Sequence, residues 1–241
     1  MSTKTVLITG ATSGIGLALA KEYTARGDRV IGCGRNKEKL ASYASCYFQT
    51  CQFDITNNHD IAKATTEVKS LDILILNAGD CLYIDDVQDF DSDAFSKVIN
   101  TNLTALGALL KHLLPKVKAG GQVVFVSSSS TILPFPRAEA YGASKAGVDY
   151  LANSLRLDLV NKRIAVTLVH PGFIKTPLTD KNTFDMPFLL SSEQAAQRIL
   201  SGVDKRKRYL HFPKRLTLLL KLLSLLPMSW WQALILKEQS T

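Results

Sequence analysis

Short apolar runs rich in β-branched residues alternate with helix-length segments along most of the chain. Six runs are clear and a seventh is weaker; they cover residues 5–9, 29–33, 46–53, 72–76, 123–127, 164–169 and, least distinctly, 208–212. Strands that are hydrophobic along their whole length are typical of a parallel sheet covered by helices on both faces. The pattern therefore predicts an α/β fold around a seven-stranded, mainly parallel sheet. Ligands of such sheets bind beside the carboxyl ends of the strands, so the residues that follow each strand are the candidates for a site.

The 241 residues are enough for a single domain, and we expect one domain over 1–241 with a hydrophobic helical extension over 204–241. The chain opens on a strand-like run and not on a signal peptide. Its four cysteines lack the spacing of a metal site, and its four histidines are scattered. We therefore expect reduced cysteines, no bound metal and a cytoplasmic protein.

The first strand ends in the glycine-rich stretch TGATSGIG, residues 9–16. Gly10 allows a sharp turn, and Gly14 and Gly16 remove side chains where the backbone must approach a ligand. The helix that follows offers unpaired N–H groups and the positive end of its dipole to a phosphate group. The spacing differs from the G-x-G-x-x-G fingerprint of dinucleotide-binding proteins, and glycine-rich turns also occur as plain structural corners.

The end of the second strand distinguishes between two cofactors. An NAD-type site places a carboxylate about 20 residues beyond the glycines, where it accepts a hydrogen bond from the ribose 2′-hydroxyl. Here that region reads IGCGRN, with Gly34 and Arg35 and no acid. A small residue followed by arginine leaves room for a 2′-phosphate and can pair with it. Beside the glycine-rich turn this predicts NADP(H) in preference to NAD(H); the alternative is an ordinary surface arginine.

Tyr141 and Lys145 are four residues apart in a segment with helical periodicity, so they lie on one face of a helix. A tyrosine with the ordinary pKa of about 10 must be shifted before it can exchange protons near neutrality. An ammonium group about 4 Å away contributes roughly 4 kcal/mol at an effective dielectric constant of 20. Lys145 and a cationic nicotinamide ring are together sufficient for that shift. Such pairs also occur on exposed helices, so this pair indicates a catalytic site only through its position in the chain.

Seven motifs in order resemble the short-chain dehydrogenase/reductase family over residues 4 to about 200. They are TGATSGIG (9–16), FDIT (53–56), LNAG (76–79), VINTNLTAL (98–106), a serine thirteen residues before the tyrosine, YGASK (141–145) and HPGFIKTP (170–177). The third motif departs slightly, because Leu76 stands where the family usually has a first asparagine. The resemblance implies a Rossmann-type, doubly wound fold and hydride transfer between a nicotinamide and a carbonyl or alcohol carbon.

The resemblance also implies roles for individual residues. Tyr141 is the acid/base, Ser128 hydrogen-bonds the developing alkoxide, and Asn102 positions a water that relays protons toward Lys145. Lys145 holds the ribose hydroxyls and lowers the pKa of the tyrosine. Cofactor contacts are expected from Gly10, Thr12, Ser13, Gly14, Ile15, Gly16, Arg35, Asp54, Ile55, Asn77, Ala78, Gly79, Tyr141, Lys145, Pro171, Gly172, Ile174 and Thr176.

Two other functions stay open beside an NADP(H)-dependent carbonyl reductase. One is an NAD(H)-dependent alcohol dehydrogenase of the same fold. The other is a non-catalytic, cofactor-sensing protein, which would keep the glycine-rich turn but lose the active-site tyrosine or lysine; this chain has both.

A hydrophobic substrate is expected from two stretches. Residues 177–190 should cover the substrate by analogy with the family, and Phe184, Met186 and Phe188 make this stretch apolar. Leu133 and Phe135 lie between the predicted serine and tyrosine, where family members also touch substrate. The expected substrate is therefore a small molecule with a hydrophobic carbonyl or alcohol.

The C-terminal part differs from the family. Residues 216–226 contain eight leucines, Trp230 and Trp231 follow, and lysines and arginines flank the segment. On a helix, Thr217, Lys221 and Ser224 form one narrow polar stripe, and Ser229 is suited to cap a second helix.

A helix this apolar needs cover, and three kinds stay open: its own domain or a second subunit, a membrane interface reached through 213–236, or the mouth of the substrate pocket. The basic residues beside the leucines favour lipid over nucleic acid, and no nucleic-acid-binding motif is present. Because the family's usual tetramer-building ending is missing, we expect a homodimer and doubt a tetramer.

Overall fold

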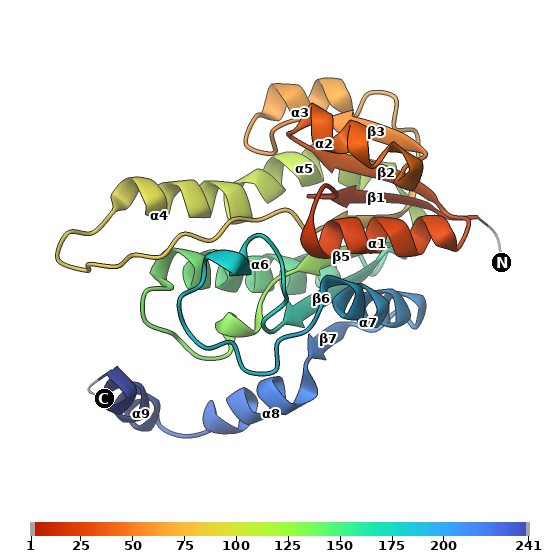
Figure 1. Ribbon diagram of the computed structural model, residues 1–241. Coiled ribbons are helices and arrows are strands. Elements are labelled where there is room, and N and C mark those ends of the chain that lie inside the picture. Colours follow the sequence, from red (N-terminus) through yellow and green to blue (C-terminus); the bar gives the residue numbers. More distant parts are fainter. Residues whose placement is uncertain (1–2, 240–241) are drawn as a thin grey trace.

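The computed structural model describes the backbone of residues 3–239 and the side chains of residues 3–237. At its centre is a seven-stranded sheet in which each neighbouring pair of strands is parallel (Figure 1). The strands are β1 (Thr5–Thr9), β2 (Arg29–Gly34), β3 (Gln49–Gln52), β4 (Leu71–Leu76), β5 (Val117–Val126), β6 (Ala165–Pro171) and β7 (Tyr209–Phe212).

The strand order along the sheet is β3-β2-β1-β4-β5-β6-β7, so the direction of winding reverses between β1 and β4. This confirms the predicted α/β, doubly wound, Rossmann-type fold. In such a sheet the ligand crevice opens at the reversal, outside the carboxyl ends of the strands.

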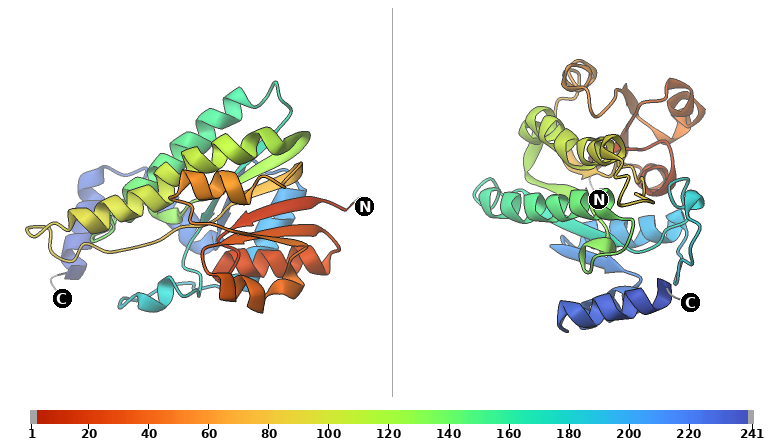
Figure 2. Two further views of the ribbon diagram at one scale, coloured as in Figure 1. Left: turned by 90° about the horizontal axis from the view of Figure 1, so that it is seen from above. Right: turned by 90° about the vertical axis from the view of Figure 1, so that its left-hand side faces the viewer.

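Helices cover both faces of the sheet (Figures 1 and 2). Helices α1 and α7 pack against each other on one face, where their small and branched side chains form a core with β1 and β4. On the other face α3, α5 and α6 enclose a second core around Phe125. The helices are α1 (Gly14–Ala25), α2 (Lys37–Ser42), α3 (Asn58–Ala64), α4 (Ser92–Ile99), α5 (Ala105–Leu113), α6 (Glu139–Asp158), α7 (Ser192–Asp204), α8 (Lys214–Leu223) and α9 (Met228–Gln239).

Two local features were not predicted. Strand β5 starts at Val117, well before the apolar run 123–127, and its pairing with β4 contains a register shift between Leu71 and Ile73. Between α4 and α5 the chain forms one turn of π-helix, Asn100–Thr104, which contains the predicted Asn102. Single π-turns of this kind interrupt longer helices most often at functional sites.

The predicted extension over 204–241 contributes strand β7 as well as α8 and α9. Thr217, the first residue of the polar stripe expected on α8, faces the domain and not solvent. It is fully buried, and its hydroxyl donates to the Pro213 carbonyl 3.0 Å away and lies 2.7 Å from His211 Nδ1. Ser229 lies inside the first turn of α9, which begins one residue earlier at Met228, so it does not precede the helix as a cap.

Among the described residues, no single helix is both long and apolar enough to cross a membrane. Residues 214–223 and 228–237 meet that requirement only as a pair, and the two helices are bent by 120° relative to each other.

Candidate active site

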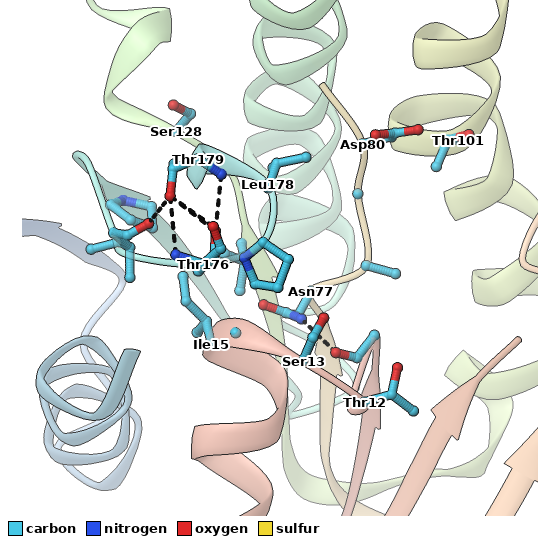
Figure 3. Close-up of a pocket in the computed structure, with 18 of the residues that line it drawn as sticks. Thr12, Ser13, Ile15, Asn77, Asp80, Thr101, Ser128, Thr176, Leu178 and Thr179 are labelled. Carbon is cyan, nitrogen blue, oxygen red and sulfur yellow. Dashed lines mark hydrogen bonds between the residues drawn. The ribbon is translucent and has the colours of Figure 1, made fainter. Parts of the chain in front are cut away.

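The turn between β1 and α1 brings the backbone close to the cleft at the carboxyl edge of the sheet. Gly10 has a φ of +66°, and a Cβ there would lie 2.9 Å from Ala78 Cα. A Cβ on Gly16 would lie 2.2 Å from the Gly10 carbonyl oxygen. Both positions therefore require glycine, and the close approach exposes the N-terminus of α1 to the cleft. Thr12, Ser13 and Ile15 surround this N-terminus in Figure 3.

Asn77 joins the ends of β1 and β4 at the point where the winding reverses (Figure 3). Its side-chain amide donates to the Thr9 carbonyl at 3.0 Å, and the backbone N–H groups of Asn77 and Ala78 donate to Thr9 Oγ1 at 3.0 and 3.1 Å. These bonds hold the LNAG segment against the glycine-rich turn, so Asn77, Ala78 and Gly79 line the cleft.

Arg35 and Asp54 lie at the far end of the cleft, beyond β2 and β3. The Arg35 side chain is 70% exposed, and its Nη1 lies 3.7 Å from Asp54 Oδ2. Burial alone would raise the pKa of the Asp54 carboxyl, but hydrogen bonds from Thr56 and the charge of Arg35 outweigh it and lower the pKa. Gly34 lies beside Thr12, since a Cβ there would be 2.9 Å from Thr12 Cγ2. An arginine that is this exposed can turn toward an anion in the cleft.

Tyr141, Ser128 and Lys145 line the same cleft at its other end. Burial raises the pKa of Tyr141 to about 12, and a hydrogen bond with Ser128 offsets part of that rise. Lys145 is almost fully buried: its Nζ donates to the Val126 carbonyl at 3.0 Å and lies 5.7 Å from the centre of the Tyr141 ring. The protein side chains by themselves therefore do not produce the predicted lowering of the Tyr141 pKa by Lys145. At neutral pH they keep the phenol protonated, the form that can donate a proton.

Burial lowers the pKa of Lys145 to about 8, while the Asp149 carboxylate acts in the opposite direction. Asp149 lies one helical turn further along α6 and is held from two sides. Ser127 Oγ donates to its Oδ1 at 2.5 Å, and His170 Nε2 lies 2.9 Å from its Oδ2. Neither Ser127, which lines the cleft, nor Asp149 was predicted from the sequence.

Asn102 lies just behind the cleft on the π-turn. Its amide donates to the Asp80 carbonyl at 2.8 Å and to Ser144 Oγ at 2.9 Å, and its Oδ1 accepts from the Asp80 N–H at 2.7 Å. These bonds attach the π-turn to α6 next to Lys145. A Cβ on Gly79 would lie 3.1 Å from Asn102 Oδ1 and 3.4 Å from Lys145 Nζ, so the two groups flank the same small space.

The segment after β6 closes the cleft opposite the glycine-rich turn. Pro171, Gly172, Ile174 and Thr176 all line it, as predicted from HPGFIKTP. Thr179, which was not predicted, holds this segment in shape: its hydroxyl donates to the Ile174 carbonyl at 2.7 Å and accepts from the Thr176 N–H at 3.0 Å (Figure 3). Threonine side chains often bond to backbone groups a few residues away, so the spacing of Thr176 and Thr179 could have indicated this role.

Of all the predicted site residues, only Gly16 and Asn102 do not themselves line the cleft, and both directly support residues that do. Two residues expected on the substrate side pack against the C-terminal helices. Leu133 is buried in a cluster with Leu216, Leu220 and Trp231, and Phe135 packs edge-on against Trp231 with ring centres 5.4 Å apart. Neither is among the residues that line the cleft, and their contact with substrate stays a prediction.

Comparisons with known proteins agree with this geometry. Residues 4–186 match the short chain dehydrogenase family. An uncharacterised oxidoreductase of Myxococcus xanthus is 31% identical over 94% of each chain, and serine 3-dehydrogenase of Agrobacterium fabrum is 33% identical over 83% of this chain and 81% of its own. The structure of L-sorbose reductase from Gluconobacter frateurii with NADPH and L-sorbose has the same fold, with a TM-score of 0.78 and 21% identity over 88% of this chain and 95% of that one.

The chain therefore belongs to the short-chain dehydrogenase/reductase family of oxidoreductases, whose members use nicotinamide cofactors and act on small molecules.

Proposed function

We propose that this protein is an NADP(H)-dependent oxidoreductase that reduces a hydrophobic ketone or aldehyde, or runs the reverse oxidation, with Tyr141 as the acid/base. The observation that carries the proposal is the single cleft that holds the glycine-rich turn and Arg35 at one end and Tyr141, Ser128 and Lys145 at the other. A cofactor bound along this cleft supplies or accepts the hydride.

The residues present fit a dinucleotide with a 2′-phosphate. The N-terminus of α1 faces the cleft because the tight turn before it has glycine at positions 10 and 16, and this arrangement suits a pyrophosphate. Arg35 lines the cleft at the end of β2, where an NAD-type site would place an acid. A guanidinium at this position favours a phosphate and leaves a bare ribose hydroxyl without its usual acceptor. The NADPH in the L-sorbose reductase structure agrees with this choice of cofactor.

The proton chemistry is assigned to the tyrosine and its two neighbours. Because the pKa of Tyr141 is about 12, its phenol is protonated at neutral pH and is suited to donate to a carbonyl oxygen as that oxygen gains charge. The Ser128 hydroxyl can hydrogen-bond the same oxygen, and the positive charge of Lys145 stabilises the phenolate that remains. In this protonation state the three side chains are arranged to assist the reduction step.

The preference for a hydrophobic substrate is argued from the loop over 177–190. Phe184 packs edge-on against Tyr83 and Phe173, with ring centres 5.8 and 6.0 Å apart, and Phe188 and Leu189 are partly exposed nearby in the chain. Leu178, from the same loop, lines the cleft. A polar substrate would find few partners among these side chains.

The test is NADPH oxidation by the purified protein with ketones and aldehydes of increasing chain length, with NADH, serine and L-sorbose as comparisons. We expect activity that rises with chain length. We expect Tyr141→Phe to lose at least about 1000-fold in kcat while the Kd for NADPH changes less than about threefold, because proton transfer depends on the phenol hydroxyl and many other residues of the cleft hold the cofactor. Turnover that survives in Tyr141→Phe, or a preference for serine or L-sorbose, would contradict the proposal.

A further inference from the structure

Helices α8 and α9, and the link between them, carry a set of exposed large apolar residues that follow one another closely in the sequence. On α8, Leu218, Leu219 and Leu222 share one helix face and are 50 to 64% exposed. On α9, Trp230 and Leu234 share a face and are 64 and 47% exposed. We call this set the outer apolar face; it consists of Leu218, Leu219, Leu222, Leu225, Leu226, Met228, Trp230 and Leu234. Single exposed leucines are ordinary, but a gathered set marks an interaction surface.

The inner sides of the same helices are already packed on the domain, so the outer apolar face cannot simply turn inward. Leu216, Leu220 and Trp231 form a buried cluster with Leu133. Trp231 Nε1 donates to the Pro134 carbonyl at 2.7 Å, which fixes the rotation of α9 about its axis. In Figures 1 and 2 the two helices lie along one side of the molecule with one flank turned away from the sheet.

The charge of the molecule is concentrated in the same segment. The chain has 29 lysines and arginines and 21 acids; eight of the basic residues and none of the acids fall between Lys205 and Lys237. The rest of the chain therefore has 21 of each, and the net charge of +8 belongs entirely to this segment. Arg215 is exposed and precedes Leu218, Leu219 and Leu222 by three, four and seven residues, which places it on the same face of α8.

We propose that the outer apolar face docks on the interface of an anionic phospholipid bilayer. Acyl chains match the leucines, an exposed tryptophan suits the headgroup level, and anionic headgroups match the basic residues. A second copy of the chain fits less well. A two-fold contact through this face would put Arg215 of both copies into one interface, and residues 205–237 contain no acid to pair with it.

Docking has a consequence for the substrate, and this step rests on the proposed function. Helix α8 touches the wall of the cleft, because a Cβ on Gly172 would lie 2.8 Å from Leu216 Cδ2. Phe173, the next residue, packs on the same cluster as Trp231. A bilayer under α8 and α9 therefore lies beside the loops that flank the cleft, and the substrate class that it would supply is a membrane-dissolved, lipid-like ketone, aldehyde or alcohol.

Binding is tested by flotation of the full chain with phosphatidylcholine vesicles that contain or lack about 30% phosphatidylglycerol. We expect binding to the anionic vesicles and a decrease as salt is raised. The chain has two tryptophans, of which Trp230 is exposed and Trp231 is 7% exposed. We therefore expect a blue shift of tryptophan fluorescence on binding that is lost in Trp230→Phe.

A matched pair of triple variants separates this surface from general stickiness. We expect Leu218→Gln, Leu219→Gln and Leu222→Gln together to weaken vesicle binding at least about tenfold, since each removes an exposed apolar side chain without touching the buried cluster. Val87→Gln, Leu157→Gln and Val160→Gln remove three exposed apolar side chains elsewhere and should leave binding unchanged. We expect Arg215→Glu to weaken binding only to the anionic vesicles.

Three results would overturn the proposal. The first is no flotation, and the second is an equal loss of vesicle binding in both triple variants. The third is absent flotation together with a wild-type dimer that becomes monomeric in the triple variant of α8. Light scattering of the same samples detects the last of these. Failure of the proposed function is distinguishable, because a chain that floats but oxidises no NADPH with any ketone or aldehyde of the chain-length series keeps the docking surface and loses the catalytic assignment. A chain that oxidises NADPH equally well with and without vesicles, and does not float, gives the opposite result.

Discussion

Asp149 connects the active-site lysine to a buried polar chain that leads away from the cleft. Its carboxylate accepts from Ser127 and lies 2.9 Å from His170, whose Nδ1 lies 3.0 Å from the Tyr209 hydroxyl. Removing water from around Lys145 disfavours its charged form, and Asp149 restores part of the lost stabilisation. Asp149 is therefore a positioning residue for the charge on Lys145.

Asp149→Asn keeps the size of the side chain and an acceptor oxygen for Ser127 but removes the charge. Burial then acts on Lys145 with less opposition, so its pKa falls further below the value of about 8. If the proton on Lys145 is needed for turnover, activity is lost as the pH rises through that pKa. We expect the alkaline limb of the kcat profile near pH 8 in the wild type, and up to about one pH unit lower in Asp149→Asn.

The profile is measured at saturating NADPH, and the control is Asp158→Asn, a change near the exposed end of the same helix. An alkaline limb at the same pH in all three proteins would mean that another group sets it. A merely structural role for Asp149 would lower kcat at every pH without moving the limb.

At the scale of whole elements, the sequence predicted what depends on local periodicity and on glycine. The βα alternation and the turn at Gly10 both follow from backbone requirements that can be read directly. The four-residue spacing of Tyr141 and Lys145 likewise determined a shared helix face. Each of these features is decided within one or two neighbouring elements.

Contacts between distant elements could not be predicted in the same way. Thr217 was predicted as part of a polar stripe on α8, but the stripe has two different surroundings: Thr217 is buried beside His211 on β7, whereas Ser224 is exposed. Leu133 and Phe135 were predicted as substrate contacts from their place after Ser128, and their packing against Trp231, about 100 residues later, was not predicted. Which apolar surface meets which depends on the packing of the whole chain.

Trp231→Ala tests the attachment of α9. Truncating a buried tryptophan normally costs about 3–5 kcal/mol. Here α9 is held mainly by one small cluster, so we expect it to detach locally and the global free energy of unfolding to fall by less than about 2 kcal/mol. Hydrogen exchange followed by mass spectrometry should show faster exchange in 228–237 and unchanged exchange in β4 and β5.

Trp230→Ala is the matched control, because that side chain is 64% exposed and should leave exchange in α9 as it is. Equal acceleration in both variants, or slow exchange in both, would mean that Trp231 does not anchor the helix.

At the scale of the whole molecule, the cleft is assembled from segments that are far apart in the sequence. Residues from the glycine-rich turn to Thr179 meet only when β1, β4, β5 and β6 are in register at one edge of the sheet. The unfolded chain therefore has no site, and a ligand of the cleft stabilises the folded state by mass action.

This linkage gives a test of cofactor choice that needs no substrate. With NADPH at about 100 times its Kd, the folded state gains about 2.7 kcal/mol, which for a chain of this length raises Tm by roughly 5–10 °C. NADH at the same concentration should raise Tm by less.

In Arg35→Ala the NADPH shift should shrink by about 3–5 °C, corresponding to a tenfold weaker Kd, while the NADH shift is unchanged. Lys37→Ala removes a neighbouring positive charge at the start of α2 and serves as the control. Equal shifts with NADPH and NADH in the wild type would contradict the proposed preference for NADP(H). An Arg35→Ala protein that loses both shifts together would make Arg35 a general support of the turn.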